Sequence, residues 1–486
     1  MSLFNFKRKG NKRIKNRAGG DAFAQSPRLQ LCSILLTSFA QDQFYRSAND
    51  TFDELVKLIP KVDTRFAAKA AIYARKEFGM RSISHVLAAE LAAYASGRSW
   101  AKEFYRQVIK RPDDMLEIMA YFYAKGGNSL PNAMKKGFAK AFDQFDSYQI
   151  GKYRGNRKAV KLIDLVNLVH PRPTARNAEA LQALVANRST ASNTWEAKLT
   201  QAGQTAKSDK DKTERKAKVW EDLMSTNKLG YFALLRNLRN IAEQAPQLTE
   251  LACQQLTDRK RIKNSLVLPF RFLTAVDAIN ASADIASKRR ILDALHRALE
   301  TSLDNVPRFA GKTLVVLDDS ASMTWGQKNM GRTPIQIGSI FAAMLYKSND
   351  ADLIRFSDDA SYVWPYHRNS AISIADQLIK DAKSAGTNFH AIFRKADKAY
   401  DRIVLLSDMQ GWMGQYAPTK EYQAYKERFD ANPYIYSFDL SAYGSLQLPE
   451  DKVFCLAGFS DKVFDIMNLL ETDRQALINK IEAVQL

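Results

Sequence analysis

The 486-residue chain has few of the features that mark secreted, membrane or disulfide-rich proteins. Its three cysteines, Cys32, Cys253 and Cys455, are far apart and lie in apolar surroundings. This spacing fits neither a disulfide framework nor a cysteine metal site, so we expect reduced core residues in a cytoplasmic protein. No run of about 18 apolar residues occurs, so we expect no membrane span. The start, residues 1–17, lacks the apolar core of a signal peptide, so we expect no secretion signal.

Patterns that support common catalytic chemistry are also missing. The five histidines form neither an H-x-x-x-H pattern nor a cluster with cysteines, so a zinc enzyme is not indicated. The chain contains no P-loop and no recognisable pair of nucleophile and base. A two-metal nuclease would need more clustered carboxylates than this sequence provides. We therefore predict that the protein is not an enzyme.

Positive charge is abundant but unevenly distributed. The net charge is +20, yet residues 311–486 hold 19 Lys and Arg against 22 Asp and Glu. Residues 1–310 hold the other 53 basic and 30 acidic residues, a net charge of +23. An excess of this size predicts a polyanion partner, and nucleic acid is the first expectation.

The basic part is predicted to be all-helical. Residues 65–76 are rich in alanine, residues 84–96 space their apolar side chains by three and four, and residues 112–125 begin with Pro and two acids. Helices of this length joined by short Gly, Pro or Asp loops are typical of an α-solenoid of HEAT-like helix pairs. We expect this array over residues 21–305, preceded by a flexible basic tail over residues 1–20.

One segment of the helical part combines basic and aromatic residues. It contains Lys152, Arg154, Arg157, Lys158 and Lys161 around Tyr153 and Gly155, and an apolar helix follows at residues 162–168. Basic groups neutralise phosphates, and Tyr or His can stack on an unpaired base. A run of this kind is more often a solvated helix face, but the net charge of +23 makes RNA contact an equal alternative.

The carboxyl-terminal part predicts a doubly wound α/β domain over residues 311–486. Apolar, β-branched runs indicate strands near residues 313–318, 351–357, 402–408, 433–439 and 452–457. Asp318, Ser320 and Ser322 follow the first of these runs at alternating positions. In an open α/β fold, the ligand site lies at the carboxyl ends of the strands.

Two later residues complete a set of oxygen donors. Thr387 follows a glycine in a loop, and Asp408 ends the run at residues 402–408. Hard cations take oxygen ligands, so Asp318, Ser320, Ser322, Thr387 and Asp408 predict a site for Mg²⁺ or another divalent cation. Asp319 is expected to point away, because neighbours in a strand face opposite sides.

This D-x-S-x-S, Thr and Asp series resembles the metal-ion-dependent adhesion site of von Willebrand factor A domains. Residues 152–173, the Trp195-Glu196 pair and especially residues 229–240 (LGYFALLRNLRN) resemble the TROVE module of the Ro ribonucleoprotein autoantigen and its bacterial relatives. In that family a ring of helical repeats precedes a von Willebrand factor A domain, and the resemblance runs from about Asp21 to the end of the chain.

The resemblance implies a function in RNA quality control or degradation. Family members bind Y-type small RNAs on the basic outer surface of the ring and receive single-stranded 3′ ends of misfolded or damaged RNAs in its centre. Some bacterial members are tethered to an exonuclease, polynucleotide phosphorylase. The family's RNA-contacting histidine matches His170, before Pro171, and its basic loop matches Arg154, Arg157, Lys158 and Lys161.

Two departures from the family pattern and one alternative function stay open. Ala385-Gly386 replaces the usual Gly-Gly before Thr387, and Met409 rather than Gly follows Asp408, although neither change removes an oxygen ligand. The alternative is a metal-dependent protein-adhesion or assembly module that does not act on RNA. RNA binding that depends on salt would distinguish the two.

Overall fold

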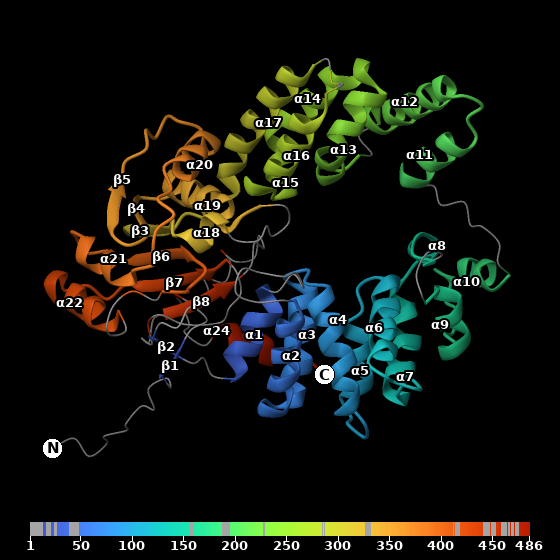
Figure 1. Ribbon diagram of the computed structural model, residues 1–486. Coiled ribbons are helices and arrows are strands. Elements are labelled where there is room, and N and C mark those ends of the chain that lie inside the picture. Colours follow the sequence, from blue (N-terminus) through green and yellow to red (C-terminus); the bar gives the residue numbers. More distant parts are fainter. Residues whose placement is uncertain are drawn as a thin grey trace.

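The computed structural model describes residues 13–15, 21–23, 27–37, 48–155, 160–186, 195–226, 229–283, 285, 287–325, 332–411, 413, 418–440, 448, 453–457, 464, 467, 471 and 476–486. A long series of helices is followed by an α/β domain built on one sheet (Figure 1). Within the described ranges, no helix is both long and apolar enough to cross a membrane.

The amino-terminal part is helical as predicted, apart from two short strands near its start. Its α-helices are α1 (Pro27–Thr37), α2 (Ala48–Leu58), α3 (Thr64–Lys76), α4 (Ser82–Glu90), α5 (Ala101–Gln107), α6 (Pro112–Ala124), α7 (Asn132–Ala141), α8 (Ser147–Lys152), α9 (Leu162–Val169), α10 (Ala178–Val185), α11 (Trp195–Gln204), α12 (Asp209–Ser225), α13 (Tyr231–Gln244), α14 (Thr249–Thr257), α15 (Arg259–Ser265), α16 (Phe270–Ala281) and α17 (Lys288–Ser302).

Local sequence explains several of these boundaries. Asp63 caps α3 by accepting a hydrogen bond from the backbone N–H of Phe66 at 2.8 Å. Pro112 occupies the first turn of α6, where its missing N–H costs no hydrogen bond. The helix expected over residues 84–96 is shorter, because α4 ends at Glu90 and a 3₁₀ turn over Leu91–Ala93 completes it.

A buried ion-pair network ties α3, α4 and α6 together. The Asp114 carboxylate, at the start of α6, is fully buried and accepts hydrogen bonds from Arg75 at 2.8 Å and Arg81 at 3.1 Å. It also accepts from the backbone N–H groups of Lys110 and Arg111. Burial alone would raise the pKa of Asp114, but hydrogen bonding and charge from His85, followed by the charge of Arg75, hold that pKa well below its ordinary value.

We expect Asp114→Asn to lower the free energy of unfolding by about 3–5 kcal/mol, because it leaves the Arg75 guanidinium buried without its counter-charge. The folded-state pKa of Asp114 is depressed, so its stabilisation is complete above the ordinary Asp value and is lost as pH falls below about 4. The loss on substitution should therefore shrink in acid.

Denaturant unfolding at neutral pH, and again about one unit below the ordinary Asp pKa, measures both effects. Asp143→Asn is the control, since Asp143 forms a partly exposed pair with Lys140 and should cost at most about 1 kcal/mol. Equal losses in the two variants would show that the buried network does not stabilise the helical part.

The sheet of the α/β domain has six strands in the order β5-β4-β3-β6-β7-β8. The strands are β3 (Thr313–Asp318), β4 (Ala351–Phe356), β5 (Ala360–Val363), β6 (Arg402–Ser407), β7 (Tyr434–Asp439) and β8 (Val453–Ala457). All neighbouring pairs are parallel except β4 and β5. The five predicted strands are confirmed, and the short antiparallel edge strand β5 is an addition.

Helices cover both faces of this sheet, as a doubly wound fold requires. Leu314 and Val316 of β3 pack in one apolar cluster with α21 (Phe389–Lys395) and α22 (Thr419–Phe429). Val315 and Leu317 face the other way, into the cluster that contains α19 (Pro334–Ser348) and α20 (Ala371–Lys380). Strand order reverses between β3 and β6, so their carboxyl ends form the topological switch point where such folds bind ligands.

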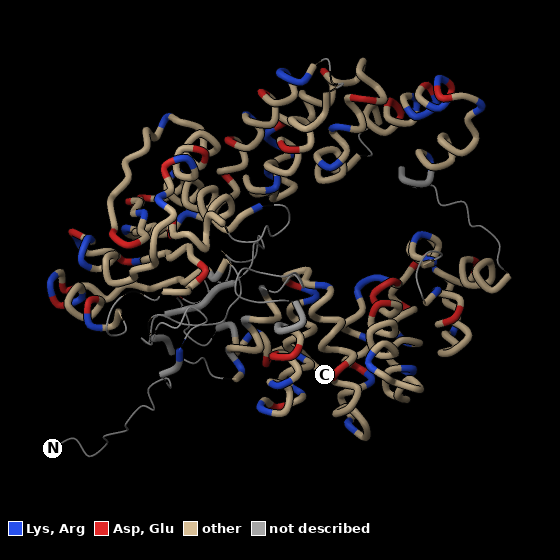
Figure 2. Tube along the Cα trace, in the orientation of Figure 1, with Lys and Arg blue, Asp and Glu red and all other residues tan. Residues whose placement is uncertain are grey.

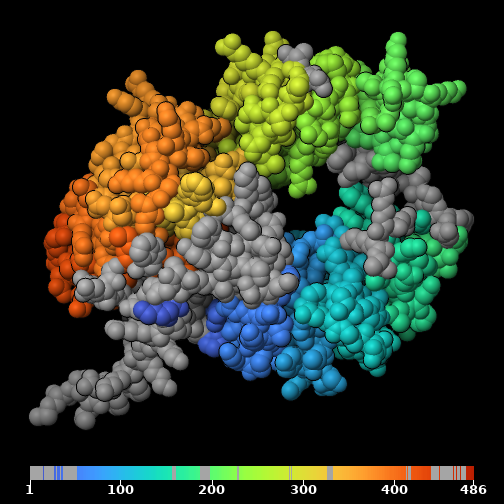
Figure 3. Space-filling model, in the orientation of Figure 1, coloured from blue at the N-terminus to red at the C-terminus, as the bar shows by residue number. Residues whose placement is uncertain are grey.

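The helices form a lower arm, α1 to α10, and an upper arm, α11 to α17, on either side of an opening (Figures 1 and 3). Residues 187–194, which separate α10 from α11 in the sequence, lie outside the described ranges. The family resemblance predicts a ring that the helical part closes by itself. Instead, at the end remote from α10 and α11, the α/β domain lies between the two arms.

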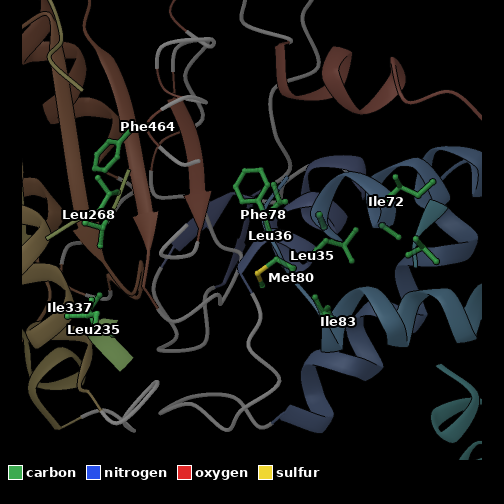
Figure 4. Close-up of a cluster of buried hydrophobic side chains, with 14 of the residues drawn as sticks. Leu35, Leu36, Ile72, Phe78, Met80, Ile83, Leu235, Leu268, Ile337 and Phe464 are labelled. Atoms are coloured by element: carbon green, nitrogen blue, oxygen red, sulfur yellow. The ribbon is translucent and has the colours of Figure 1, made fainter. Parts of the chain in front are cut away.

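Two junctions hold the α/β domain between the arms. At the upper arm, Phe270 of α16 stacks on Phe341 of α19, with ring centroids 5.4 Å apart. Figure 4 shows Ile337 of α19 and Phe464 on the same side of the apolar cluster as Leu235 and Leu268.

At the lower arm, α24 (Ala476–Glu482) packs on α3, and the Glu482 carboxylate pairs with Arg28 of α1 at 3.2 Å. Helix α1 also contacts β8. Side chains of α1, including Leu35 and Leu36, lie beside Phe78 and Met80 there (Figure 4). The connection of the α/β domain to the lower arm therefore depends on contacts between residues near the two ends of the chain.

The amino-terminal tail differs in part from its expected flexible state. Strand β1 (Arg13–Lys15) pairs antiparallel with β2 (Asp21–Phe23), with Ile14 opposite Ala22. Backbone hydrogen bonding between two short strands orders these residues despite the density of basic side chains. Residues 1–12 and 16–20 lie outside the described ranges.

Candidate metal centre and nucleic-acid interface

The predicted oxygen donors all lie at the carboxyl end of the sheet and all are buried. Asp318 is the last residue of β3, Ser320 follows it, and Ser322 lies in the first turn of α18 (Ala321–Trp325). Asp408 directly follows β6, and Thr387 lies in the loop before α21. None of the five is more than 5% exposed.

Hydrogen bonds bring the first three donors together. The backbone N–H of Ser320 donates to Asp318 Oδ1 at 2.9 Å, and the hydroxyl oxygens of Ser320 and Ser322 are 3.4 Å apart. The Thr387 loop is attached to the same turn, because the backbone N–H of Ala321 donates to the carbonyl of Ala385 at 2.9 Å. The alternating D-x-S-x-S spacing therefore collects side chains at one point.

Asp408 stands close enough to Asp318 to influence its charge. Burial, followed by the negative charge of Asp408, raises the pKa of the Asp318 carboxyl to about 7. Among the described residues, no Lys or Arg forms an ion pair with Asp318. Nearby basic residues of the domain pair with other carboxylates, Lys398 with Asp352 and Arg402 with Glu471. A hard cation placed between two such carboxylates would favour their ionised forms.

The donor set fits a hard divalent cation in its chemistry. It contains two carboxylates and three hydroxyls, all oxygen ligands, at a point where three chain segments meet. Among the described residues there is no group of three or more His, Cys, Asp or Glu that could hold a metal. That pattern would mark a zinc or carboxylate-cage site, whereas the present set relies on hydroxyls for most of its donors.

Asp319 is directed away from these donors, as the alternation of β3 predicts. Its carboxylate accepts a hydrogen bond from the backbone N–H of Lys383 at 3.2 Å, and its carbonyl accepts from Ser384 N–H at 2.9 Å. Asp319 thus fixes the loop that carries Thr387.

Met409, directly after Asp408, has a φ of 57°. This left-handed backbone conformation costs energy for a residue other than glycine.

The basic segment lies around the end of α8 and the start of α9. Lys152 ends α8, and its ammonium donates to the Tyr148 hydroxyl at 3.2 Å. Lys161 precedes α9, and the carbonyl of Arg154 accepts from Leu162 N–H at 2.9 Å, which joins the two helices. Arg157 and Lys158 lie outside the described residues.

His170 lies apart from this basic segment. It is exposed and follows the last residue of α9 with a left-handed φ of 47°. Lys161 is at the opposite end of the same helix, and nine residues of helical rise separate the two by about 13 Å. The structure therefore groups Lys152, Arg154 and Lys161 but holds His170 at a second position.

Two residues that the sequence prediction missed belong beside Lys152. The Arg111 guanidinium lies 4.5 Å from the centre of the Tyr153 ring, and the Tyr148 ring is 40% exposed. Both contribute to a surface of interleaved basic and aromatic groups. The basic run alone indicated Tyr153, but Arg111 immediately precedes α6 and is brought there only by packing between the helices.

Comparison with known proteins assigns the helical part. The TROVE domain family model matches residues 21–215 and 185–301, which together cover more than half of the chain. The chain belongs to the TROVE domain family. The matched region contains α1 to α16 and nearly all of α17, and it ends before β3.

The relatives of this TROVE protein differ in how much of their length they share with it. It is 24% identical over 350 residues to telomerase protein component 1 of Mus musculus and 23% identical to that of Rattus norvegicus, yet it spans only 13% of their length. It is 23% identical over 481 residues to RNA-binding protein RO60 of Deinococcus radiodurans, a match that covers 89% of this chain and 90% of the relative.

A solved structure extends the likeness to the α/β domain. The crystal structure of the Deinococcus radiodurans RO (RSR) protein superposes with a TM-score of 0.64 at 18% identity and covers 90% of this chain and 99% of that one. At this identity the likeness establishes the fold alone. A TROVE helical part followed by an α/β domain is thus an architecture shared with that protein.

Proposed function

We propose that the protein binds RNA and acts, without enzymatic activity of its own, in RNA quality control or degradation. The observation that carries the proposal is the match along almost the whole chain to a relative named as an RNA-binding protein. The net charge of +23 over residues 1–310 supports it, because phosphate contacts dominate affinity for nucleic acid. Lys and Arg positions are spread along the chain trace of both helical arms (Figure 2).

The family resemblance suggests two classes of RNA contact for the candidate residues. Structured small RNA of the Y type would bind an outer basic surface through Lys152, Arg154, Arg157, Lys158 and Lys161. A single-stranded 3′ end of a misfolded or damaged RNA would enter the centre between the arms and contact His170. An exonuclease such as polynucleotide phosphorylase would be the partner that consumes the threaded strand.

We assign the α/β domain, residues 311–486, as a von Willebrand factor A domain with a metal-ion-dependent adhesion site. Asp318, Ser320 and Ser322 would hold Mg²⁺ or another divalent cation, with Thr387 and Asp408 completing the site directly or through water. Only two of the five donors are anionic, so the cation would keep affinity for water or an acidic partner group. The helical part, residues 21–305, would be the RNA-binding ring, and residues 1–20 a basic arm.

The strand-end donors also favour a second candidate, a metal-dependent protein-adhesion module that does not act on RNA. In that case the basic helical surface would meet an acidic protein. The two candidates differ in salt response and in competition: RNA binding that falls steeply with salt and is not displaced by an acidic polypeptide supports the first candidate, and the converse supports the second.

We expect His170→Ala to weaken RNAs with a free single-stranded 3′ end by about fivefold or more, because loss of a stacking partner costs at least about 1 kcal/mol per base. A blunt hairpin should bind with unchanged affinity, since its bases are paired and cannot reach a side chain in the centre. Filter binding of one hairpin RNA, with and without a 3′ overhang, separates the two contributions.

His367→Ala is the matched control, since His367 is also exposed but lies in the α/β domain. Both variants should retain the thermal midpoint of the parent protein. Equal weakening of the hairpin and the overhang RNA by His170→Ala, or no weakening of either, would remove His170 from the central channel.

A further inference from the structure

The chain leaves strand β5, at the outer edge of the sheet, through a segment with exposed aromatic side chains. Tyr362 and Trp364 are two residues apart, and their rings stack with centroids 5.3 Å apart and 14° between their planes. Tyr366 follows two residues later. We call these three residues the aromatic edge. Single exposed aromatic side chains are common on protein surfaces, but a group of them indicates an interaction site.

The aromatic edge is unusually open to solvent. Trp364 is 62% exposed and Tyr366 is 82% exposed, the highest value among the large apolar side chains of the described residues. Nevertheless, the segment is anchored on the body of the domain. Pro365 is buried, and its carbonyl accepts a hydrogen bond from the Tyr346 hydroxyl of α19 at 3.0 Å. An anchored segment loses little conformational entropy when a partner binds to it.

Trp364 and Tyr366 also carry hydrogen-bond donors that the described part of the chain does not use. The indole N–H of Trp364 and the hydroxyl of Tyr366 have no partner among the described residues. The Tyr362 hydroxyl, by contrast, donates to Asp397 Oδ1 at 2.7 Å. At interfaces, such groups bond to the partner while the rings supply apolar contact area. The aromatic edge therefore suits a ligand that combines apolar surface with free hydrogen-bond acceptors.

Negative charge is in excess beside the aromatic edge. The carboxylates of Asp350, Asp352 and Asp397 lie around the ammonium of Lys398, which pairs with Asp352 at 3.0 Å. Hydrogen bonding to Asp352, together with the charges of the three carboxylates, raises the pKa of Lys398. Asp397 is exposed and contacts the edge through its hydrogen bond with Tyr362. Three carboxylates around one ammonium attract a cationic ligand and repel the phosphates of nucleic acid.

The aromatic edge is separate from the candidate metal centre and from the opening between the helical arms. In Figure 1, β5 lies on the outer side of the α/β domain, away from that opening. Among the described strands it pairs only with β4. Because β5 runs antiparallel to β4, it leads Trp364 away from the end of the sheet that holds Asp318 and Asp408. A partner can therefore bind this edge without covering the oxygen donors.

Addition of a strand to the free side of β5 fits these features less well. Strand β5 has only four residues, and Pro365 follows two residues after its end, so the ladder would be short. Tyr362 packs on the apolar cluster at one face of the sheet, and Trp364 stacks on Tyr362. The exposed rings thus belong to a face of the sheet, whereas an added strand would bond along its edge.

We propose that the aromatic edge docks a proline-rich segment of a partner protein that has an arginine or lysine beside its prolines. Such a segment adopts the polyproline II conformation, which leaves its backbone carbonyls free and docks on surfaces lined by aromatic side chains. Trp364 and Tyr366 pack on the prolines and donate to the carbonyls, and Asp397 pairs with the basic side chain. The inference concerns a protein partner and does not depend on the proposed RNA-binding function.

Fluorescence anisotropy with the intact chain and a labelled peptide, a run of prolines flanked by arginines, tests this docking. Trp364→Ala should weaken binding about tenfold or more, because truncation of an aromatic anchor is among the most costly changes at an interface. Tyr366→Ala should act in the same direction. Asp397→Asn should weaken binding about fivefold, as expected for loss of one exposed ion pair. It should leave unchanged the affinity for a peptide with glutamines in place of the arginines.

Trp325→Ala and Asp359→Asn are the matched controls, since these residues are also exposed in the α/β domain but lie outside the aromatic edge. Both should bind the peptide as the parent protein does. All these variants replace exposed side chains, so they should keep the thermal midpoint of the parent. A peptide that carries a photoreactive benzophenone group should label residues 362–368 of the parent protein.

Several outcomes would overturn the inference. A parent protein that does not bind the peptide contradicts it, as does equal affinity of Trp364→Ala and Trp325→Ala. Equally tight binding of a peptide with alternating valine and threonine in place of the prolines would favour strand addition to β5. Weaker oligouridylate binding by Trp364→Ala would make the edge an RNA-stacking surface instead. A hairpin RNA should bind every variant as it binds the parent, so this inference and the proposed function can fail independently.

Discussion

Replacing Arg154 and Arg157 together by glutamate should weaken structured RNAs of unrelated sequence on the order of a hundredfold, because repulsion replaces two charge-assisted hydrogen bonds to phosphates. The decrease should be similar from one RNA to the next, since phosphate contacts carry little sequence information. The slope of log affinity against log salt should also become shallower, by about 0.9 for each duplex phosphate that the variant no longer neutralises.

A control of equal charge isolates position from net charge. Lys380→Glu with Lys395→Glu changes the net charge by the same amount at two exposed positions of the α/β domain. Electrophoretic mobility shift assays at several salt concentrations, on the same RNAs, would compare the two double variants. Equal weakening by both would mean that the protein attracts RNA through its overall charge and has no basic surface at residues 152–161.

Replacing Asp318 and Asp408 together by alanine should abolish divalent cation binding, because the site then loses both of its anionic ligands. Isothermal calorimetry should give a saturable Mg²⁺ signal for the parent protein and none for the double variant. A cation that binds only the folded state raises stability by mass action, so Mg²⁺ should also raise the thermal midpoint of the parent and leave the variant unchanged.

Asp319→Ala provides the matched control for this prediction. It removes the neighbouring carboxylate, which accepts from the backbone of Lys383 and does not join the donors. It should lower affinity for the cation only modestly, through a looser Thr387 loop. A double variant that binds Mg²⁺ as tightly as the parent would count against the site.

The sequence predicted those helices and strands that carry a strong local pattern of apolar and polar residues. The runs that became β3 and β6 are apolar and β-branched, and each ends at a polar turn, so their bounds agree with the structure within one residue. Strand β5 has only four residues and pairs at the sheet edge, where no apolar alternation identifies it. The position of the α/β domain between the arms depends on α24 packing on α3, a contact between distant parts of the chain that no local pattern contains.

In the candidate sites, too, residues close together in the sequence were predictable and contacts between distant segments were not. Asp318, Ser320 and Ser322 were predictable because a short spacing at a strand end places them together. Ser407 was missed, although its hydroxyl donates to the Asp318 carboxylate, because the contact depends on the pairing of β3 with β6. Sequence could have indicated it only once the two strands were known to be neighbours.

The contact of Arg111 with Tyr153 was hidden for a related reason. Packing between helices brings the two residues together from separate parts of the sequence. Motifs thus indicated which residues matter, and packing between elements decided which of them act together.

The most direct test of the account is equilibrium binding of one hairpin RNA, with and without a single-stranded 3′ overhang, to the intact protein over a series of salt concentrations. The account predicts that both RNAs bind, that both affinities fall steeply as salt rises, and that the overhang RNA binds more tightly at every salt concentration. Affinities that do not respond to salt, or a chain that binds neither RNA, would contradict the claim that this TROVE protein is an RNA-binding protein.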